Sequence, residues 1–129
     1  MISVVYDAGV LVAADRNERR TWADHKVCLE LGVIQLVPAP VVAQVSRSPQ
    51  QAQLRRFLTG CVVIPLGEHE AHEARWLLVK TKTADVIDAV VVTTAIRQKA
   101  SILTSDPDDI DDIKRLVAAS GHDVVVVNI

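Results

Sequence analysis

Residues 2–7 read Ile-Ser-Val-Val-Tyr-Asp, and residues 101–106 read Ser-Ile-Leu-Thr-Ser-Asp. Both stretches are short and mostly apolar, and each ends on an aspartate. Continuous apolar runs of this length predict strands that are buried on both faces of a parallel sheet. Functional sites in open parallel sheets lie beyond the carboxyl ends of the strands. Asp7 and Asp106 both fall at that position.

The rest of the chain alternates between short apolar runs and longer helical stretches. Strands are predicted at residues 2–6, 34–37, 62–65, 101–104 and 124–127. Helices are predicted at residues 21–31, 39–47, 50–58, 68–80, 85–99 and 108–120, the last with Gly121 as its C-cap. The helix at 21–31 carries an apolar stripe of Trp22, Val27, Cys28 and Leu31. This alternation predicts an α/β fold, a three-layer α/β/α sandwich with a central parallel sheet, as a single domain over residues 1–129.

Composition narrows the class of function. Half of the residues are hydrophobic, which excludes a disordered chain. The 14 basic and 16 acidic side chains give a net charge of −2, which argues against a protein that holds nucleic acid by bulk positive charge. A nuclease with an acidic centre among local arginines stays compatible with this balance. The four aromatic side chains are too few for a base-stacking platform.

Location is predicted from what the sequence lacks. The first seven residues have neither the basic start nor the long apolar run of a signal peptide, and no apolar stretch approaches the ~20 residues of a membrane span. We therefore expect a cytoplasmic protein without a membrane partner, in which Cys28 and Cys61 are reduced thiols. The histidines show no zinc-binding pattern, and we expect all four on helix surfaces: His25, His69, His72 and His122.

A third acidic residue falls in the first turn of the predicted helix at 85–99. Asp88 would lie beside Asp7 and Asp106 if the strands at 2–6 and 101–104 are neighbours in the sheet. Converging carboxylates repel one another, and a divalent cation such as Mg²⁺ or Mn²⁺ removes that repulsion. Because such an ion activates water and stabilises charge on a phosphate, the three acids predict metal-assisted phosphodiester hydrolysis.

Each acid also has a purely structural interpretation. Asp7 is placed to cap a helix that begins at Ala8, and Asp85 and Asp88 have the spacing of a capping box. The acidic run from Asp106 to Asp112 suits the N-terminus of the following helix. We favour the capping role for Asp85, and the functional role for Asp7, Asp88 and Asp106 taken together.

Four segments in register carry a resemblance to a known family. They are VVYDAGVL (residues 4–11), PVVAQVSR (40–47), DVIDA (85–89) and LTSD (103–106). In their order and spacing the sequence resembles a PIN-domain ribonuclease, in particular the VapC-type toxin of type II toxin–antitoxin pairs. The resemblance implies an α/β/α sandwich in which the first and fourth strands are neighbours.

The same resemblance implies roles for individual residues. Asp7, Asp88 and Asp106 would be the catalytic acids and would bind Mg²⁺ or Mn²⁺. The hydroxyls of Thr104 and Ser105 would lie near the site, where they are candidate substrate contacts.

Gln44 departs from the family pattern, because most relatives carry a glutamate there. An amide oxygen can touch a metal or a water but brings neither charge nor general-base capacity. Asp85 or Asp109 would be auxiliary acids that partly restore the charge. Arg47 is expected three residues later on the same helix face as Gln44, either as a phosphate contact or in a surface ion pair.

Two functions of different class are therefore expected. The first is a metal-dependent endoribonuclease toxin that cleaves RNA phosphodiester bonds, is neutralised by a cognate VapB-like antitoxin in an exposed groove, and forms a homodimer. The second is a catalytically impaired PIN domain that acts by binding an antitoxin or RNA. This alternative arises because Gln44 stands where most relatives carry a glutamate.

Overall fold

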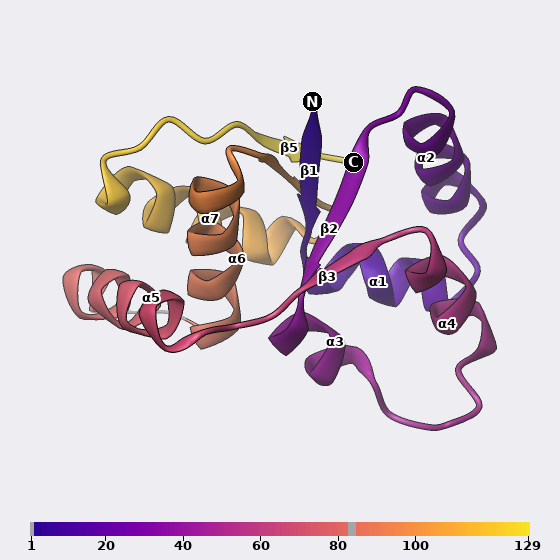
Figure 1. Cartoon of the computed structure of the whole chain (residues 1–129), viewed down its shortest axis with the longest axis horizontal. Helices are drawn as coiled ribbons and strands as arrows, with labels where there is room; N and C mark the ends of the chain where they lie inside the picture. Colours follow the sequence, from indigo (N-terminus) through magenta and orange to yellow (C-terminus); the bar gives the residue numbers. More distant parts are fainter. Residues whose placement is uncertain (1, 83–84) are drawn as a thin grey trace.

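A five-stranded parallel sheet forms the centre of the protein within residues 2–82 and 85–129, the parts of the chain that this computed structural model describes (Figure 1). The strand order is β3-β2-β1-β4-β5, and every neighbouring pair is parallel. The strands are β1 (Ser3–Tyr6), β2 (Ile34–Pro38), β3 (Val62–Ile64), β4 (Ser101–Thr104) and β5 (Val126–Asn128).

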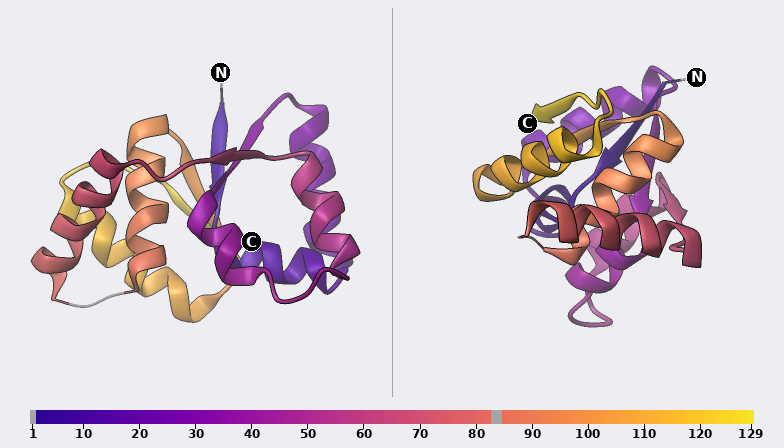
Figure 2. Two further views of the ribbon diagram at one scale, coloured as in Figure 1. Left: turned by 60° about the horizontal axis from the view of Figure 1, so that its bottom comes forward. Right: turned by 90° about the vertical axis from the view of Figure 1, so that its left-hand side faces the viewer.

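Helices cover both faces of this sheet, as predicted. They are α1 (Ala8–Asp15), α2 (Arg19–Glu30), α3 (Ala39–Val45), α4 (Ala52–Thr59), α5 (Glu68–Thr81), α6 (Val86–Gln98) and α7 (Pro107–Ser120). In Figure 1, α1, α2 and α4 lie to the right of the sheet, and α5, α6 and α7 pack together to its left. Figure 1 and the right-hand view of Figure 2 place α3 and the loop after it at the lower end of the molecule. No helix in the described ranges is long and apolar enough to cross a membrane.

The adjacency of the first and fourth strands is confirmed. Tyr6 of β1 is in register with Leu103 of β4, and the backbone N–H of Asp7 donates to the Leu103 carbonyl over 3.2 Å. The ends of β1 and β4 are therefore fixed side by side, which brings the residues that follow them to one edge of the sheet.

The apolar runs predicted that every strand is buried on both faces, and this is wrong for the edge strands. β1, β2 and β4 are central and largely buried, whereas Val62 and Val63 of the edge strand β3 are exposed. β5 lies at the opposite edge and begins two residues later than predicted. Edge strands have a neighbour on one side only, so part of their surface faces water.

α6 runs through the protein interior with residues 88–95 all buried. Its many β-branched residues have modest helix propensity, but burial against β1, β2 and β4 outweighs that preference. The Asp85 side chain caps this helix by accepting a hydrogen bond from the Ile87 N–H over 2.7 Å, so the predicted capping role is confirmed. A buried helix with a defined start fixes the position of Asp88 in its first turn.

The predicted stripe on α2 is confirmed at Trp22, which packs against the core, but it is wrong at Val27 and Leu31, which are exposed. The predicted surface position of His25 is wrong. His25 is only 4% exposed and its Nδ1 lies 3.0 Å from the Tyr6 hydroxyl. The His25 ring also lies 4.0 Å from the Phe57 ring, centroid to centroid. The face of α2 that packs on the sheet is therefore built from Thr21 and His25 rather than from its aliphatic residues. Apolar periodicity misses such a face because the contact is aromatic and hydrogen-bonded.

Because burial lowers the pKa of His25, the folded state binds fewer protons there than the unfolded state. The contribution of neutral His25 to stability is present above its unfolded pKa of about 6.5 and is lost as the pH falls below it. We predict that the free energy of unfolding in urea differs less between wild type and His25→Gln at pH about 5.5 than at pH about 7.5. The exposed His72→Gln is the control, and an equal difference at both pH values would contradict the assignment.

Candidate active site

Asp7 stands at the carboxyl end of β1 and begins α1. One carboxylate oxygen accepts a hydrogen bond from the Val10 N–H over 3.2 Å, so the capping role is confirmed. The side chain is only 1% exposed, and its second oxygen, Oδ2, is buried without a hydrogen-bond partner in the described residues. Asp7 thus caps a helix with one oxygen and leaves the other available.

The electrostatic surroundings of Asp7 are acidic. Burial, with a smaller effect from the nearby carboxylates of Asp109 and Asp106, raises its pKa to about 6, although the Thr104 hydroxyl and the Val10 N–H favour the charged form and lower it. A group with this pKa exchanges its proton close to neutral pH. No basic side chain among the described residues compensates the charged form of Asp7.

The segment after β4 presents Ser105 and Asp106. Asp106 caps α7 by accepting a hydrogen bond from the Asp108 N–H over 2.9 Å. The Thr104 hydroxyl accepts the Asp106 N–H over 3.3 Å and has no exposed surface. Thr104 therefore lies near the site, as predicted, but its burial fits a role in orienting Asp106 and Asp7 rather than direct contact with substrate.

Gly9 permits the close approach of α1 to this segment. A Cβ atom at position 9 would lie 3.0 Å from the Ser105 Oγ and 3.3 Å from the Asp106 backbone nitrogen. A larger side chain would push α1 away from the segment after β4. Asp7 and Asp106 would then separate, because they belong to these two segments.

Asp88 forms the second part of the acidic group. It is 6% exposed, and burial, a hydrogen bond with Asp112 and the charge of Asp109 raise its pKa to about 9. The neutral form of the Asp88 carboxyl group is therefore favoured in the metal-free protein. Asp112 was predicted only as part of a helix-capping surface.

Asp109 connects the two parts. It is among the carboxylates that raise the pKa of Asp7 and also among those that raise the pKa of Asp88. Its own pKa is raised by burial and by the charges of Asp106, Asp85 and Asp112. The spacing of Asp109 and Asp112, one helical turn apart, is the sequence signal that could have singled out this face of α7.

The donors of this group are all oxygen atoms, the type that Mg²⁺ and Mn²⁺ prefer. The unpartnered Asp7 Oδ2 and the raised carboxyl pKa values are what a cation would relieve. Within the described residues, however, no three Asp, Glu, His or Cys side chains converge closely enough to form a complete metal site. The donor set fits a divalent cation in chemistry, and side-chain rearrangement would have to complete it.

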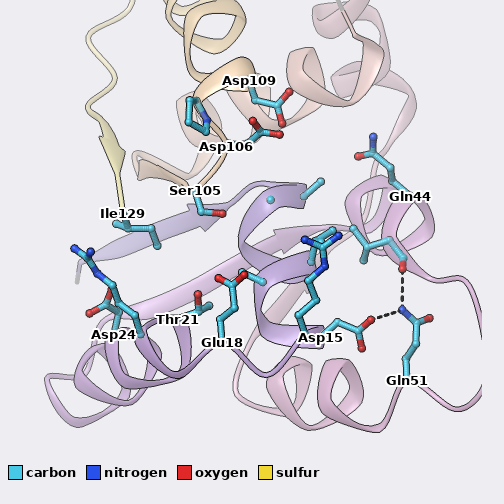
Figure 3. A pocket seen from close by; sticks show the side chains of 18 of the residues that line it. Asp15, Glu18, Thr21, Asp24, Gln44, Gln51, Ser105, Asp106, Asp109 and Ile129 are labelled. Atoms are coloured by element: carbon cyan, nitrogen blue, oxygen red, sulfur yellow. Dashed lines mark hydrogen bonds between the residues drawn. The ribbon is translucent and has the colours of Figure 1, made fainter.

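A cleft of about 920 Å³ is lined by Asp106 and Asp109, whereas Asp7 and Asp88 do not line it. Figure 3 shows Asp106 and Asp109 on one side of it and Gln44 opposite them. Gln44 is half-buried, and its Oε1 is buried without a hydrogen-bond partner in the described residues. Gln44, the residue that departs from the family pattern, thus lines the same cleft as Asp106 and Asp109.

Arg47 lines the cleft. The prediction that it shares a helix face with Gln44 is wrong. α3 ends at Val45, and Ser46 has extended backbone angles, so Arg47 lies in the following loop. Arg16 and Arg20 also line the cleft. None of these three arginines forms an ion pair with a carboxylate in the described parts of the chain, which leaves their charges available to an anion.

A family model described as the PIN domain matches residues 4–116. The chain belongs to the PIN domain family. No curated protein matches the sequence.

Several solved structures are similar to this PIN domain. They include VapBC2 from Rickettsia felis bound to a DNA fragment from its promoter, with TM-score 0.76, 14% identity and 99% of each chain covered. A toxin–antitoxin complex from Klebsiella pneumoniae has TM-score 0.68 and 18% identity, covering 97% of this chain and 96% of that one. FitAcB from Neisseria gonorrhoeae has TM-score 0.65 and 15% identity, with the same coverage. At these identities the likeness establishes the shared fold.

Asp88→Asn should stabilise the metal-free protein, and more so as the pH rises from about 5 to about 8. The unfolded carboxyl group ionises near pH 4, whereas the folded one keeps its proton up to about pH 9, so wild type loses stability over this range. We expect a gain of several degrees in Tm at pH about 8.

Asp111→Asn, an exposed change on α7, is the matched control for this thermal-unfolding series. A Tm for Asp88→Asn that stays below that of wild type at pH about 8 would show that Asp88 is not held as a strained acid.

Proposed function

We propose that this PIN domain is a metal-dependent endoribonuclease toxin that cleaves RNA and is neutralised by a cognate VapB-like antitoxin. The observation that carries the proposal is the group of carboxylates around Asp109, whose charge raises the pKa of the buried Asp7 and Asp88. Asp109 also lines a cleft to which both arginines and carboxylates contribute. Membership of the PIN domain family and the toxin–antitoxin origin of the similar structures support it.

The residues of the chain would divide the work. Asp7, Asp88 and Asp106 would hold Mg²⁺ or Mn²⁺, with Asp109 as a further acid and Asp85 fixing the start of α6. When bound, the ion would supply an activated water and stabilise charge on the phosphate.

The other cleft residues would serve the RNA. Arg47 would bind a backbone phosphate, since guanidinium groups suit phosphate geometry. Ser105 lines the cleft and would contact the RNA strand. The buried Thr104 would orient Asp7 and Asp106.

The antitoxin would occupy the exposed cleft and thereby exclude RNA. The similar structures include toxin–antitoxin complexes, which supports a partner of this kind. We also propose that two copies form a homodimer in the cytoplasm, as the resemblance to VapC-type toxins implies.

A second function is favoured by two observations at the site. Gln44 brings no charge, and no three ligating side chains in the described residues converge. Both fit a catalytically impaired PIN domain that acts by binding an antitoxin or RNA.

Asp7→Asn should reduce RNA cleavage by about 100-fold or more, because it removes a metal-binding charge while the amide oxygen still caps α1. The measurement is cleavage of total RNA with Mg²⁺ or Mn²⁺, together with growth arrest on induced expression. The exposed Asp123→Asn should cleave like wild type. Undiminished cleavage by Asp7→Asn would sink the catalytic assignment, and arrest without cleavage would favour the binding function.

Gln44→Glu should lower the Mg²⁺ concentration for half-maximal cleavage by about tenfold, since it adds a carboxylate where an unpartnered oxygen faces the cleft. Gln98→Glu, an exposed change on α6, is the control for added charge. An unchanged Mg²⁺ requirement would place Gln44 outside the metal site. Cleavage by Gln44→Glu alone, with none by wild type, would identify an impaired enzyme.

A further inference from the structure

Gln51 ties the loop between α3 and α4 to the C-terminal end of α1. Its side-chain oxygen accepts hydrogen bonds from two consecutive backbone N–H groups, Arg47 at 2.6 Å and Ser48 at 3.0 Å. Its side-chain nitrogen donates to the Asp15 Oδ2 at 2.9 Å and to the Val45 carbonyl at 3.1 Å. Figure 3 shows Gln51 between Asp15 and the end of α3. The amide has therefore satisfied all its usual bonds within the fold.

These bonds fix the backbone of Arg47 but leave its side chain available. The guanidinium is exposed, and the one hydrogen bond that it forms within the described residues, to the Ser46 carbonyl, is 3.5 Å long, at the limit for such a bond. Arg47 nevertheless lines the cleft beside the acids. A charged group with a fixed base and a free end is suited to bind an anion that enters the cleft.

Asp15 gives this loop a reference point in the active site. It is the last residue of α1, the helix that Asp7 begins, so the two lie about 12 Å apart along one rigid element. The bond from Gln51 to the Asp15 carboxylate joins segments 36 residues apart in sequence and is strengthened by the charge of the acceptor. The position of Arg47 relative to Asp7 is thus set through α1.

We infer that Gln51, anchored by Asp15, is a positioning residue that holds Arg47 to bind a backbone phosphate of the RNA in the cleft. This inference rests on the proposed function, because it takes RNA as the ligand. Gln51 has no hydrogen bond to Asp7, Asp88 or Asp106 within the described residues, and it acts on binding through Arg47.

The test is binding of a fluorescent single-stranded RNA to the full chain in EDTA, where no strand is cleaved, over a series of KCl concentrations. Arg47→Ala should weaken binding by about tenfold and reduce the slope of log affinity against log salt by about 0.7, the loss of one phosphate contact. Gln51→Ala should move both quantities in the same direction, by less.

A double-mutant cycle separates positioning from a general effect on the fold. In the Arg47→Ala background, Gln51→Ala should cause no further loss of affinity, because its effect passes through the missing guanidinium. Gln50→Ala, an exposed neighbour in the same loop, is the matched control and should bind RNA like wild type. Asp15→Ala, which removes only the anchor, should resemble Gln51→Ala and serves if that variant does not fold.

The outcomes distinguish this inference from the proposed function. Wild-type affinity in both Gln51→Ala and Asp15→Ala, or an equal loss from Gln51→Ala with and without Arg47, would overturn the positioning role alone. A wild-type protein that does not bind RNA would overturn the proposed function and this inference with it.

Discussion

Asp109 lies close enough to raise the pKa of both Asp7 and Asp88, and no basic side chain in the described residues lowers the pKa of these three acids. Like charges in a poorly solvated place oppose folding, so other interactions must hold them there. The β1–β4 pairing fixes Asp7, and the burial of α6 fixes Asp88. The rest of the structure can be understood as the scaffold that holds these carboxyl groups together, and the proposed cation would relieve their repulsion.

Helix capping is the local device that makes the arrangement possible. Asp7, Asp85 and Asp106 each begin a helix by accepting a backbone N–H, so each is held in one orientation by its own element. Capping uses one carboxylate oxygen, and at Asp7 the other is left buried and unpartnered. The structural and functional interpretations of these residues are therefore compatible, and a change that preserves the cap can remove the chemistry alone.

Much of this could be predicted from the sequence, because the strands and the aspartates that follow them are local features. The apolar runs at β1 and β4 give the strands, and the Asp at the end of each gives two of the acids. The adjacency of these two strands was predicted only from the family resemblance, because a single sequence does not reveal strand order. What the sequence could not show depends on contacts between distant segments. His25 is buried against Tyr6 and Phe57, and Arg47 lies in the loop after α3, where its backbone N–H bonds to the distant Gln51 side chain.

The central claim is that the acidic group is a cation site held in a partly protonated state. It is tested most directly by calorimetry of Mn²⁺ binding at pH about 6 in buffers of different ionisation enthalpy, which counts the protons released per ion. Because the pKa values of Asp7 and Asp88 are raised to about 6 and about 9, the account predicts release of about one proton or more on binding. Binding without proton release, or no binding at millimolar Mn²⁺, would contradict it.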